Sequence, residues 1–375
     1  MRQHNIALVH DWLVSMRGGE KVLEVLCELF PQATLFTLVH QSGKLSPTIE
    51  RMNIETSFLQ SLPLARAKYQ YYLPIFPAAI EHLDLSEFDV VISSGHAAAK
   101  GVRLRKGTLH ICYCHTPMRY IWDQYEQYFG KGRSSVLTRM IMRMFLPSLR
   151  AWDKKTAEGV HHFIANSHCV QERIKRIYGR DSVVIYPPVD VNRFSLSTND
   201  ENYFLIVSAL VPYKRIDVAV KAFNKLGKKL VIAGTGSELA RLKAMAKNNI
   251  AFIGWADDER LKLFYEKCRA LVFPGEEDFG IVPVEAMACG KPVIAFAAGG
   301  ALETIVDKKT GLFFGKKGRC DDEQIESLIA TIEEIEKMNF DAQLIRHHAM
   351  QFERELFKQK LKSYLDVCWK NYFSE

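Results

Sequence analysis

Residues 270–296, with the sequence ALVFPGEEDFGIVPVEAMACGKPVIAF, combine two short apolar runs with a helix-compatible segment between them. The runs at 270–273 and 292–296 are continuously apolar, as expected for strands buried on both faces of a parallel sheet. Residues 284–289 predict a helix between the two strands. Because a strand, a helix and a second strand in this order form a right-handed βαβ unit, the stretch indicates an α/β protein.

The same alternation extends over the whole chain. Further predicted strands lie at residues 5–10, 88–93, 109–114, 162–165, 203–207, 229–233 and 250–253. The series restarts near residue 200, after Pro187-Pro188 and the polar stretch 195–202, which we interpret as a linker. The chain has 375 residues, a length that suits two domains.

We therefore predict two facing, doubly wound Rossmann-like domains with a cleft between them. The first comprises residues 1–190 and is completed by a C-terminal helix, 355–375; the second comprises 191–354. Ligands should bind at the carboxyl ends of the strands.

Composition limits the possible partners. The formal net charge of +7 is a mild excess without the clustered basic tracts of a nucleic-acid binder, so we expect no nucleic-acid partner. It suits a nucleotide diphosphate or an anionic lipid surface. The sequence shows no signal peptide and no apolar run long enough to cross a bilayer, and its eight cysteines are scattered. We expect a cytoplasmic protein with reduced thiols.

Two carboxylates in the opening stretch are the first candidate site. Glu277 should follow a strand at its carboxyl end, and Glu285 should lie in the first turns of the next helix. Between them, Phe279-Gly280-Ile281 can present backbone N–H groups to an anion. Carboxylates at this spacing can accept hydrogen bonds from vicinal hydroxyls, but an acidic surface loop next to a helix dipole explains the residue types equally well.

Cationic and glycine-rich segments follow other predicted strands. Lys214-Arg215 opens a helix, where an anion is the simplest reason for adjacent cations; a solvated basic turn is the alternative. Gly18-Gly19 allows close approach of a phosphate or a sugar, and Gly234 begins a Gly-x-Gly turn. His115 ends a strand, although a lone histidine is more often structural.

Residues 277–285 resemble the E-x7-E signature of the retaining glycosyltransferases of family 4, which have the GT-B architecture, and the resemblance extends over nearly the whole chain. It implies that Glu277 binds the donor sugar, that Glu285 binds the ribose of the nucleotide, and that His115 approaches the sugar. It places Gly18-Gly19 near the donor phosphates and Gly234 near the nucleobase. Asp11 and Asn166 would then lie on the acceptor side.

The family usually has an Arg followed by a Lys that clamp the donor diphosphate. Lys214 matches the Lys, but Ala209 stands where the Arg is expected, and Arg215 is our candidate for the missing charge. Residues 113–122, 93–96 and 210–217 resemble a mannosyltransferase subgroup of bacterial O-antigen assembly. This favours GDP-mannose as donor, with UDP-sugars or other GDP-sugars as rivals. A non-catalytic sensor of nucleotide sugars or glycans, and an epimerase or phosphorylase on the same architecture, are further alternatives.

Metal and membrane contacts complete the expectations. No Asp-x-Asp occurs, so we expect metal-independent chemistry without a cofactor. Cys112, Cys114 and His115 do not predict a zinc site, because strand alternation puts His115 on the other face. Residues 69–80 and 131–150 could lie on an anionic membrane and meet a lipid-linked glycan acceptor, or they could cap the acceptor site of a protein that does not touch a membrane.

Overall fold

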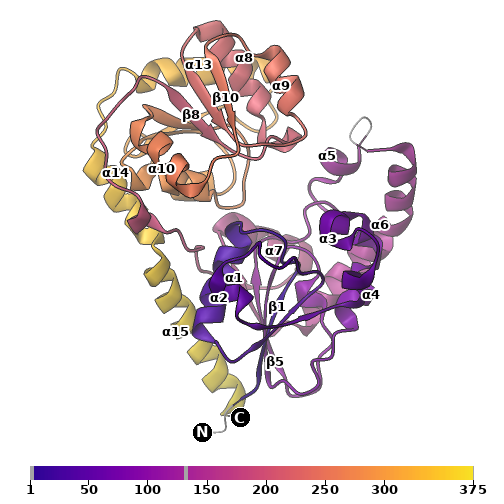
Figure 1. Cartoon of the computed structure of the whole chain (residues 1–375). Helices are drawn as coiled ribbons and strands as arrows, with labels where there is room; N and C mark the ends of the chain where they lie inside the picture. Colours follow the sequence, from indigo (N-terminus) through magenta and orange to yellow (C-terminus); the bar gives the residue numbers. More distant parts are fainter. Residues whose placement is uncertain (1–3, 131–133, 375) are drawn as a thin grey trace. The chain divides into compact units, whose positions relative to one another are not determined.

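The computed structural model describes residues 4–130 and 134–374 and divides into two α/β units (Figure 1). The first unit comprises Met1–Pro187 and Lys358–Glu375, and the second comprises Pro188–Phe357. Each unit contains one fully parallel sheet with helices around it, so the predicted α/β, doubly wound fold class is confirmed.

The first sheet has the strand order β3-β2-β1-β4-β5-β6-β7. Its strands are β1 (Ile6–His10), β2 (Thr34–Thr37), β3 (Asn53–Thr56), β4 (Val90–Gly95), β5 (Leu109–Cys114), β6 (His162–Ala165) and β7 (Ser182–Val184). Its helices are α1 (Gly18–Leu29), α2 (Pro47–Glu50), α3 (Ala65–Lys68), α4 (Phe76–Glu81), α5 (Tyr125–Phe129), α6 (Val136–Thr156) and α7 (His168–Tyr178). The 3₁₀ turns are η1 (Phe58–Ser61), η2 (Tyr69–Ile75), η3 (Ala99–Gly101) and η4 (Ala157–Gly159). The connections diverge from β1 and β4, which makes their carboxyl ends the switch point where such sheets bind ligands.

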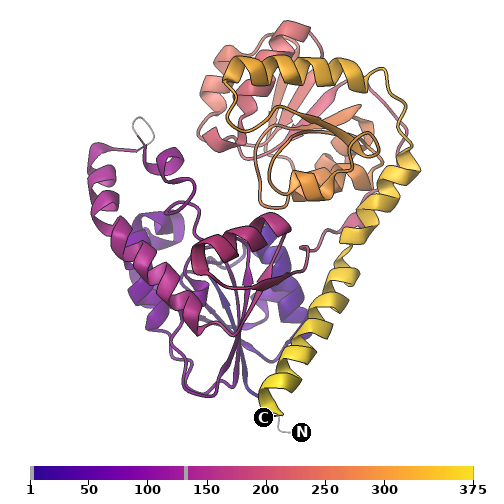
Figure 2. The same ribbon diagram turned by 180° about the vertical axis from the view of Figure 1, so that it is seen from behind.

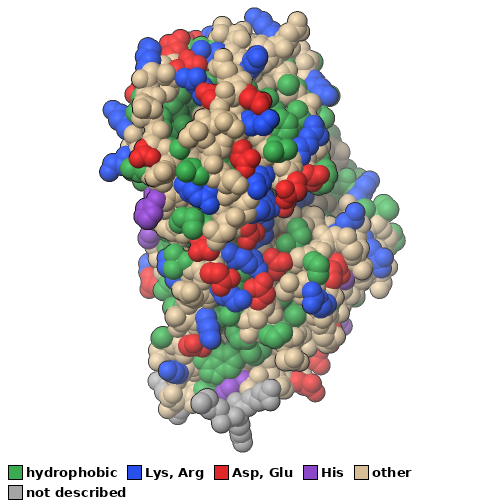
Figure 3. Space-filling view, turned by 60° about the vertical axis from the view of Figure 1, so that its left-hand side comes forward, with side chains coloured by type: hydrophobic (Ala, Val, Ile, Leu, Met, Phe, Trp, Pro, Cys, Tyr) green, Lys and Arg blue, Asp and Glu red, His purple; other side chains and the backbone are tan. Residues whose placement is uncertain are grey.

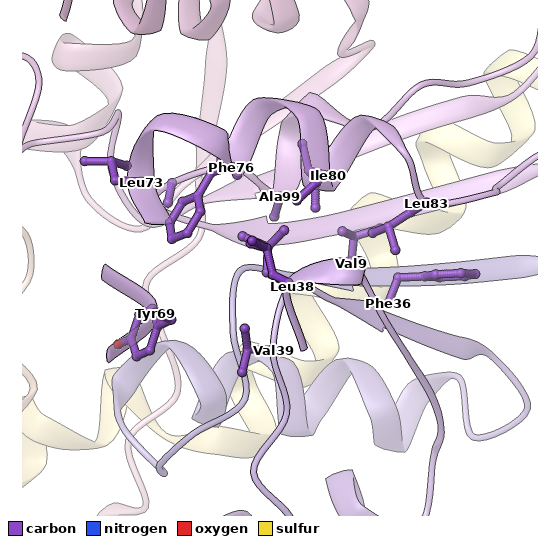
Figure 4. Packing of buried hydrophobic residues seen from close by; sticks show 14 of the residues in the cluster. Val9, Phe36, Leu38, Val39, Tyr69, Leu73, Phe76, Ile80, Leu83 and Ala99 are labelled. Atoms are coloured by element: carbon purple, nitrogen blue, oxygen red, sulfur yellow. The ribbon is translucent and has the colours of Figure 1, made fainter. Parts of the chain in front are cut away.

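The largest core of the first unit lies between its sheet and the helices α4 and α6. Phe36 and Val9 of the sheet and Phe76 and Ile80 of α4 belong to one cluster (Figure 4), and all four side chains are almost completely buried. Burial of each such side chain contributes about 1.5–3 kcal/mol to folding. This core fixes the sheet edge that carries the first group of site residues.

The second sheet has the order β10-β9-β8-β11-β12-β13. Its strands are β8 (Phe204–Val207), β9 (Leu230–Ala233), β10 (Ile250–Gly254), β11 (Ala270–Phe273), β12 (Val293–Phe296) and β13 (Gly311–Phe314). Its helices are α8 (Ile216–Leu226), α9 (Leu239–Met245), α10 (Asp258–Lys267), α11 (Ile281–Ala288), α12 (Ala301–Thr304), α13 (Asp321–Ile335) and α14 (Ala342–Ala349), with the 3₁₀ turns η5 (Val191–Arg193), η6 (Pro212–Lys214) and η7 (Met350–Phe352). Here the switch point lies between β8 and β11.

Three local predictions need correction. The helix expected at 284–289 begins earlier, at Ile281, because Gly280 adopts a left-handed conformation (φ 93°) and ends the preceding loop. Gly18-Gly19 is the first turn of α1 and not a separate loop. The polar stretch 195–202 belongs to the second unit, where Ser197 N donates to Cys289 O at 3.0 Å and Ser197 Oγ to Glu266 O at 2.6 Å.

The last helix, α15 (Arg354–Phe373), lies beside the first unit in both views (Figures 1 and 2). Its aromatic side chains make the contacts: Trp369 packs edge-on against His4, and Tyr364 against His162. Figure 3 shows Lys and Arg interspersed with Asp and Glu on one face of the molecule. No helix among the described residues is both long and apolar enough to cross a membrane.

Candidate functional site

The predicted donor residues lie in loops at the carboxyl ends of the second sheet. Lys214 follows β8, Gly234 follows β9, and Glu277 follows β11. Since β8 and β11 are neighbours at the switch point, the strand order brings Lys214 and Glu277 together.

Lys214 and Glu277 form an ion pair between Nζ and Oε1, and their side chains are 15% and 25% exposed. Glycines allow this close arrangement. A Cβ at Gly275 would lie 2.9 Å from Lys214 Cα, and one at Gly299 would lie 2.3 Å from Glu277 O. The loop is held further by Gly300 N, which donates to Glu277 O at 2.9 Å. The two predicted donor ligands are therefore fixed side by side.

Arg215 has different partners. Its backbone is left-handed (φ 51°), and its Nη2 lies 2.5 Å from Asp321 Oδ1 at the start of α13. Its Nε lies 3.6 Å from Asp217 Oδ1 on α8. Arg215 is thus neutralised by two carboxylates that belong to the helices, whereas Lys214 pairs with Glu277. The idea that Arg215 replaces the Arg missing at Ala209 stays a prediction.

Glu285 is 9% exposed on α11, and its Oε2 accepts a hydrogen bond of 2.8 Å from the Tyr265 hydroxyl of α10. Burial, and then the nearby Glu285 carboxylate, raise the pKa of Tyr265 well above its usual value, so this hydroxyl keeps its proton and remains a donor. Tyr265 orients Glu285. Sequence reasoning missed it, because a Tyr within an amphipathic helix gives no sign of a polar partner.

Backbone geometry explains the remaining donor-side glycines. Gly234 has a φ of 137°, and a Cβ there would lie 1.9 Å from Ser208 O. The loop after β9 therefore runs directly against the segment that leads to Lys214.

Gly280 precedes Ile281 at the start of α11, while the ring of Phe279 is buried against Phe352 with ring centroids 5.4 Å apart. Only backbone atoms of Phe279 remain suited to the predicted anion contact.

In the first unit, His115 follows β5 at the switch-point edge of the sheet. Its Nε2 lies 2.9 Å from Ser94 Oγ, and its backbone N donates to Gly95 O at 3.0 Å. Burial, and then the neighbouring His10 and His96, hold its pKa well below the usual value. His115 is therefore a neutral imidazole at physiological pH, suited to hydrogen bonding and not to supplying a positive charge.

Gly18-Gly19 lies close to this histidine. A Cβ at Gly19 would be 3.6 Å from His115 Nε2 and 3.7 Å from His10 Cε1, in van der Waals contact with both imidazoles. The helix start is capped by Glu20, whose Oε2 accepts from Arg17 N at 3.0 Å. The structure therefore places Gly19 next to His115.

Asp11 is fully buried, and its carboxylate accepts four backbone hydrogen bonds from residues 96–99, at 2.6 to 2.9 Å. The donors are the three loop residues that follow β4 and the first residue of η3. Asp11 therefore shapes the sheet edge without lining its surface, and its predicted contact with an acceptor stays a prediction. Asn166 is 7% exposed after β6, where its Oδ1 accepts from Ser167 Oγ at 3.1 Å. Ser167 in turn caps α7.

Cys112 and Cys114 lie together in a hydrophobic cluster with Phe163 and Ile174, while His115 contacts Ser94 instead. Within residues 4–130 and 134–374, no group of three or more His, Cys, Asp or Glu side chains is arranged to hold a metal ion.

Comparison with known proteins identifies the family of the chain. The family model "Glycosyltransferase Family 4" matches residues 16–193, and "Glycosyl transferases group 1" matches residues 189–347. An uncharacterized glycosyltransferase of Methanocaldococcus jannaschii is 34% identical over 41% of this chain and 46% of its own length. The O-antigen chain mannosyltransferase RfbU of Salmonella typhimurium is 32% identical over 38% of this chain and 43% of its own. The chain thus spans less than half the length of these two relatives.

Solved structures extend the similarity to nearly the whole fold. Anabaena HepE, in a complex with UDP-glucose, superposes with a TM-score of 0.69 at 19% identity, covering 97% of this chain and 100% of its own. At this identity the likeness establishes the fold alone. Because the two family models together span residues 16–347, the chain belongs to glycosyltransferase family 4 and has the GT-B fold.

Proposed function

We propose that this protein transfers a hexosyl group from a nucleotide diphosphate sugar to a hydroxyl group of a glycan acceptor, with retention of the anomeric configuration. The observation that carries the proposal is the placement of Lys214 beside Glu277 at the switch point of the second sheet. An ammonium group suits a diphosphate, and a carboxylate suits sugar hydroxyls.

In the proposed reaction the bond between the anomeric carbon and the diphosphate oxygen breaks, and a bond from the acceptor oxygen to that carbon forms on the same face. The acceptor proton passes to the leaving phosphate. Lys214 stabilises the negative charge that develops on the diphosphate. Glu277 orients the sugar, Glu285 holds the ribose, and the neutral imidazole of His115 hydrogen-bonds the reacting sugar.

GDP-mannose is the proposed donor. Support comes from the resemblance of the sequence to O-antigen mannosyltransferases and from the identity with RfbU, which is named an O-antigen chain mannosyltransferase. UDP-glucose is the rival that has a specific observation in its favour, since HepE, a neighbour in fold, was solved with it. Surface polysaccharide assembly is the corresponding proposed role.

Titration of GDP, UDP, GDP-mannose and UDP-glucose, followed by thermal unfolding and by nucleotide release with glycan acceptors, tests the proposal. GDP-mannose should raise the melting temperature most and should turn over to a product with an α-anomeric NMR signal. Failure of all four ligands to stabilise the protein would exclude the donor site. Binding without turnover across an acceptor panel would favour a non-catalytic nucleotide-sugar sensor. Turnover should survive EDTA if Lys214 and helix N-termini neutralise the diphosphate without a metal.

We further propose that the acceptor is lipid-linked and that α6 contacts an anionic membrane. The outer face of α6 exposes large apolar side chains at helical spacing: Val136 (64%), Leu137 (67%), Met140 (67%) and Met144 (69%). The opposite face is anchored through Asp153, which accepts hydrogen bonds from Lys100, Trp122 and Tyr178. The exposed face is therefore held in place, and its hydrophobicity is not needed for the fold.

The charge of this surface favours lipid headgroups over a neutral apolar partner. Arg143 is exposed on α6, Arg139 and Arg150 of the same helix are half-buried and donate to Ser134 O and Ile121 O, and the one acidic residue of the helix, Asp153, is buried. Residues 58–80, which include η2 in contact with α6, also contain no Asp or Glu. Residues 131–133, at the start of the predicted membrane segment, lie outside the described residues.

Sedimentation with vesicles tests the membrane proposal. Wild-type protein should bind vesicles that contain phosphatidylglycerol and should bind pure phosphatidylcholine weakly. Met140→Glu together with Met144→Glu should abolish binding, whereas Val367→Glu on α15, where the native side chain is 54% exposed, should not change it. Equal binding of the double variant and wild type would show that α6 does not contact the membrane.

A further inference from the structure

The Lys214–Glu277 ion pair is a contact that a bound donor would have to break. The ammonium group of Lys214 contacts Glu277 and lies 5.4 Å from the Tyr213 ring centroid. Both paired side chains are largely shielded from water, at 15% and 25% exposure. Leaving either charge without a partner therefore costs more free energy than it would for a fully exposed charge.

The neighbouring charges are already paired elsewhere. Glu276 binds Lys317 at 2.8 Å, and Arg215 binds Asp321 at 2.5 Å. Neither of these pairs involves Lys214 or Glu277. When a ligand takes Lys214, the carboxylate of Glu277 must therefore find its compensation on the ligand itself.

We propose, on the basis of the proposed function, that the Lys214–Glu277 ion pair makes the protein bind an intact nucleotide sugar more tightly than the nucleoside diphosphate that remains after transfer. A nucleotide sugar offers phosphate oxygens to Lys214 and hydroxyl donors to Glu277, so it replaces both halves of the ion pair. A nucleoside diphosphate offers only phosphate. It removes Lys214 from Glu277 and leaves the carboxylate uncompensated beside a second anion.

The consequence is a bias toward product release. Once the sugar has left, Glu277 competes with the nucleoside diphosphate for Lys214, and re-forming the ion pair expels the product. Gly275 and Gly299 allow the loop of Glu277 to lie next to Lys214. Glu277 therefore competes with the nucleoside diphosphate for Lys214 from within the same molecule.

Isothermal titration with GDP, UDP and their sugars tests the selectivity. Glu277→Gln should bind the nucleoside diphosphate about 3- to 10-fold more tightly than wild type, because Lys214 is released. The same variant should bind the nucleotide sugar no more tightly, and product inhibition should strengthen in parallel. Glu276→Gln is the matched control: its carboxylate is also 25% exposed and paired with a lysine, and its removal should leave both affinities unchanged.

The Lys214→Ala variant tests whether the effect of Glu277→Gln comes from freeing Lys214 or only from removing a negative charge near the diphosphate. There, Glu277→Gln should no longer strengthen nucleoside diphosphate binding. An equal gain with and without Lys214, an unchanged affinity in Glu277→Gln, or an equal gain for diphosphate and sugar nucleotide would each overturn the selectivity proposal. These outcomes leave the proposed activity standing. Failure of wild type to bind any of the four ligands would overturn both proposals.

Discussion

Each sheet carries candidate site residues at its own switch point, but the two sets of side chains differ in how their charges are compensated. In the first unit, the edge at β1, β4 and β5 carries the neutral imidazole of His115 and a carboxylate, Asp11, whose charge is satisfied by backbone N–H groups. In the second unit, the edge at β8 and β11 carries the charged side chains of Lys214 and Glu277, which satisfy one another. A common scaffold thus presents hydrogen-bonding groups on one unit and exchangeable charges on the other.

This difference teaches that burial decides which carboxylate is structural. Asp11 is 0% exposed, and four backbone donors hold it, so a ligand could reach it only by taking the loop apart. Glu277 is 25% exposed, and its partner is a flexible side chain that can move. Both are acidic residues that follow a parallel strand, and only the tertiary surroundings distinguish them.

Asp11→Ala should cause the largest change in stability. It removes four charge-assisted acceptor bonds and leaves buried N–H groups unpaired, so the free energy of unfolding in urea should fall by about 4 kcal/mol. Asp181→Ala, whose native side chain is 93% exposed, should leave the urea midpoint unchanged. An Asp11→Ala variant that keeps its stability but no longer binds the acceptor would show that Asp11 contacts the acceptor.

Lys214→Ala should have the opposite profile, with catalysis lost and stability kept. Removing the charge that faces the diphosphate should lower kcat/KM by about 10²- to 10³-fold. The urea midpoint should fall only slightly, because the Glu277 carboxylate that loses its partner is still 25% exposed to water. Lys225→Ala, which removes a cation of α8 paired with Glu326, should retain full activity. Comparable activity of the two variants would show that Lys214 does not face the donor.

Acid should destabilise the neutral histidines of the first unit. Burial, and then His161 and Lys100, lower the pKa of His110 to about 3, and the pKa of His115 is also lowered. The unfolded chain takes up these protons below pH ~6.5 and the folded chain does not, so stability is complete above that pH. Below it, the free energy of unfolding should fall by up to about 1.4 kcal/mol per pH unit for each histidine.

The measurement for these histidines is urea unfolding at a series of pH values between 7.5 and 5. His110→Gln and His115→Gln should each reduce the slope. An unchanged slope in either variant would mean that burial does not hold the pKa of the corresponding histidine below its usual value.

Arg215→Ala should have the smallest effect of these changes. Its guanidinium group is occupied by Asp321 and Asp217, so kcat/KM should fall by less than about 5-fold, in line with the loss of a partly exposed ion pair. Steady-state kinetics of Arg215→Ala, measured alongside Lys214→Ala, tests this expectation. A loss as large as that of Lys214→Ala would make Arg215 the second diphosphate ligand and would show that it leaves Asp321 when the donor binds.

Much of the fold follows from local pattern. The predicted strands at 109–114, 162–165 and 270–273 coincide with β5, β6 and β11, because strands buried in a parallel sheet are mostly apolar. Sequence reasoning missed β2, β3, β7 and β13. Polar residues in β2, β3 and β7 hide the apolar signal, and β3, β7 and β13 lie at the edges of their sheets.

The sequence by itself determined the fold class and placed the candidate site residues in loops that follow strands, since both depend on short-range periodicity and on the rule that ligands bind at the carboxyl ends of parallel strands. Only the tertiary structure decided the pairings. Strand order brought Lys214 to Glu277, helix packing brought Tyr265 to Glu285, and the first turn of α13 supplied Asp321 to Arg215. Such contacts depend on the distance and burial of groups far apart in the chain, which no local pattern encodes.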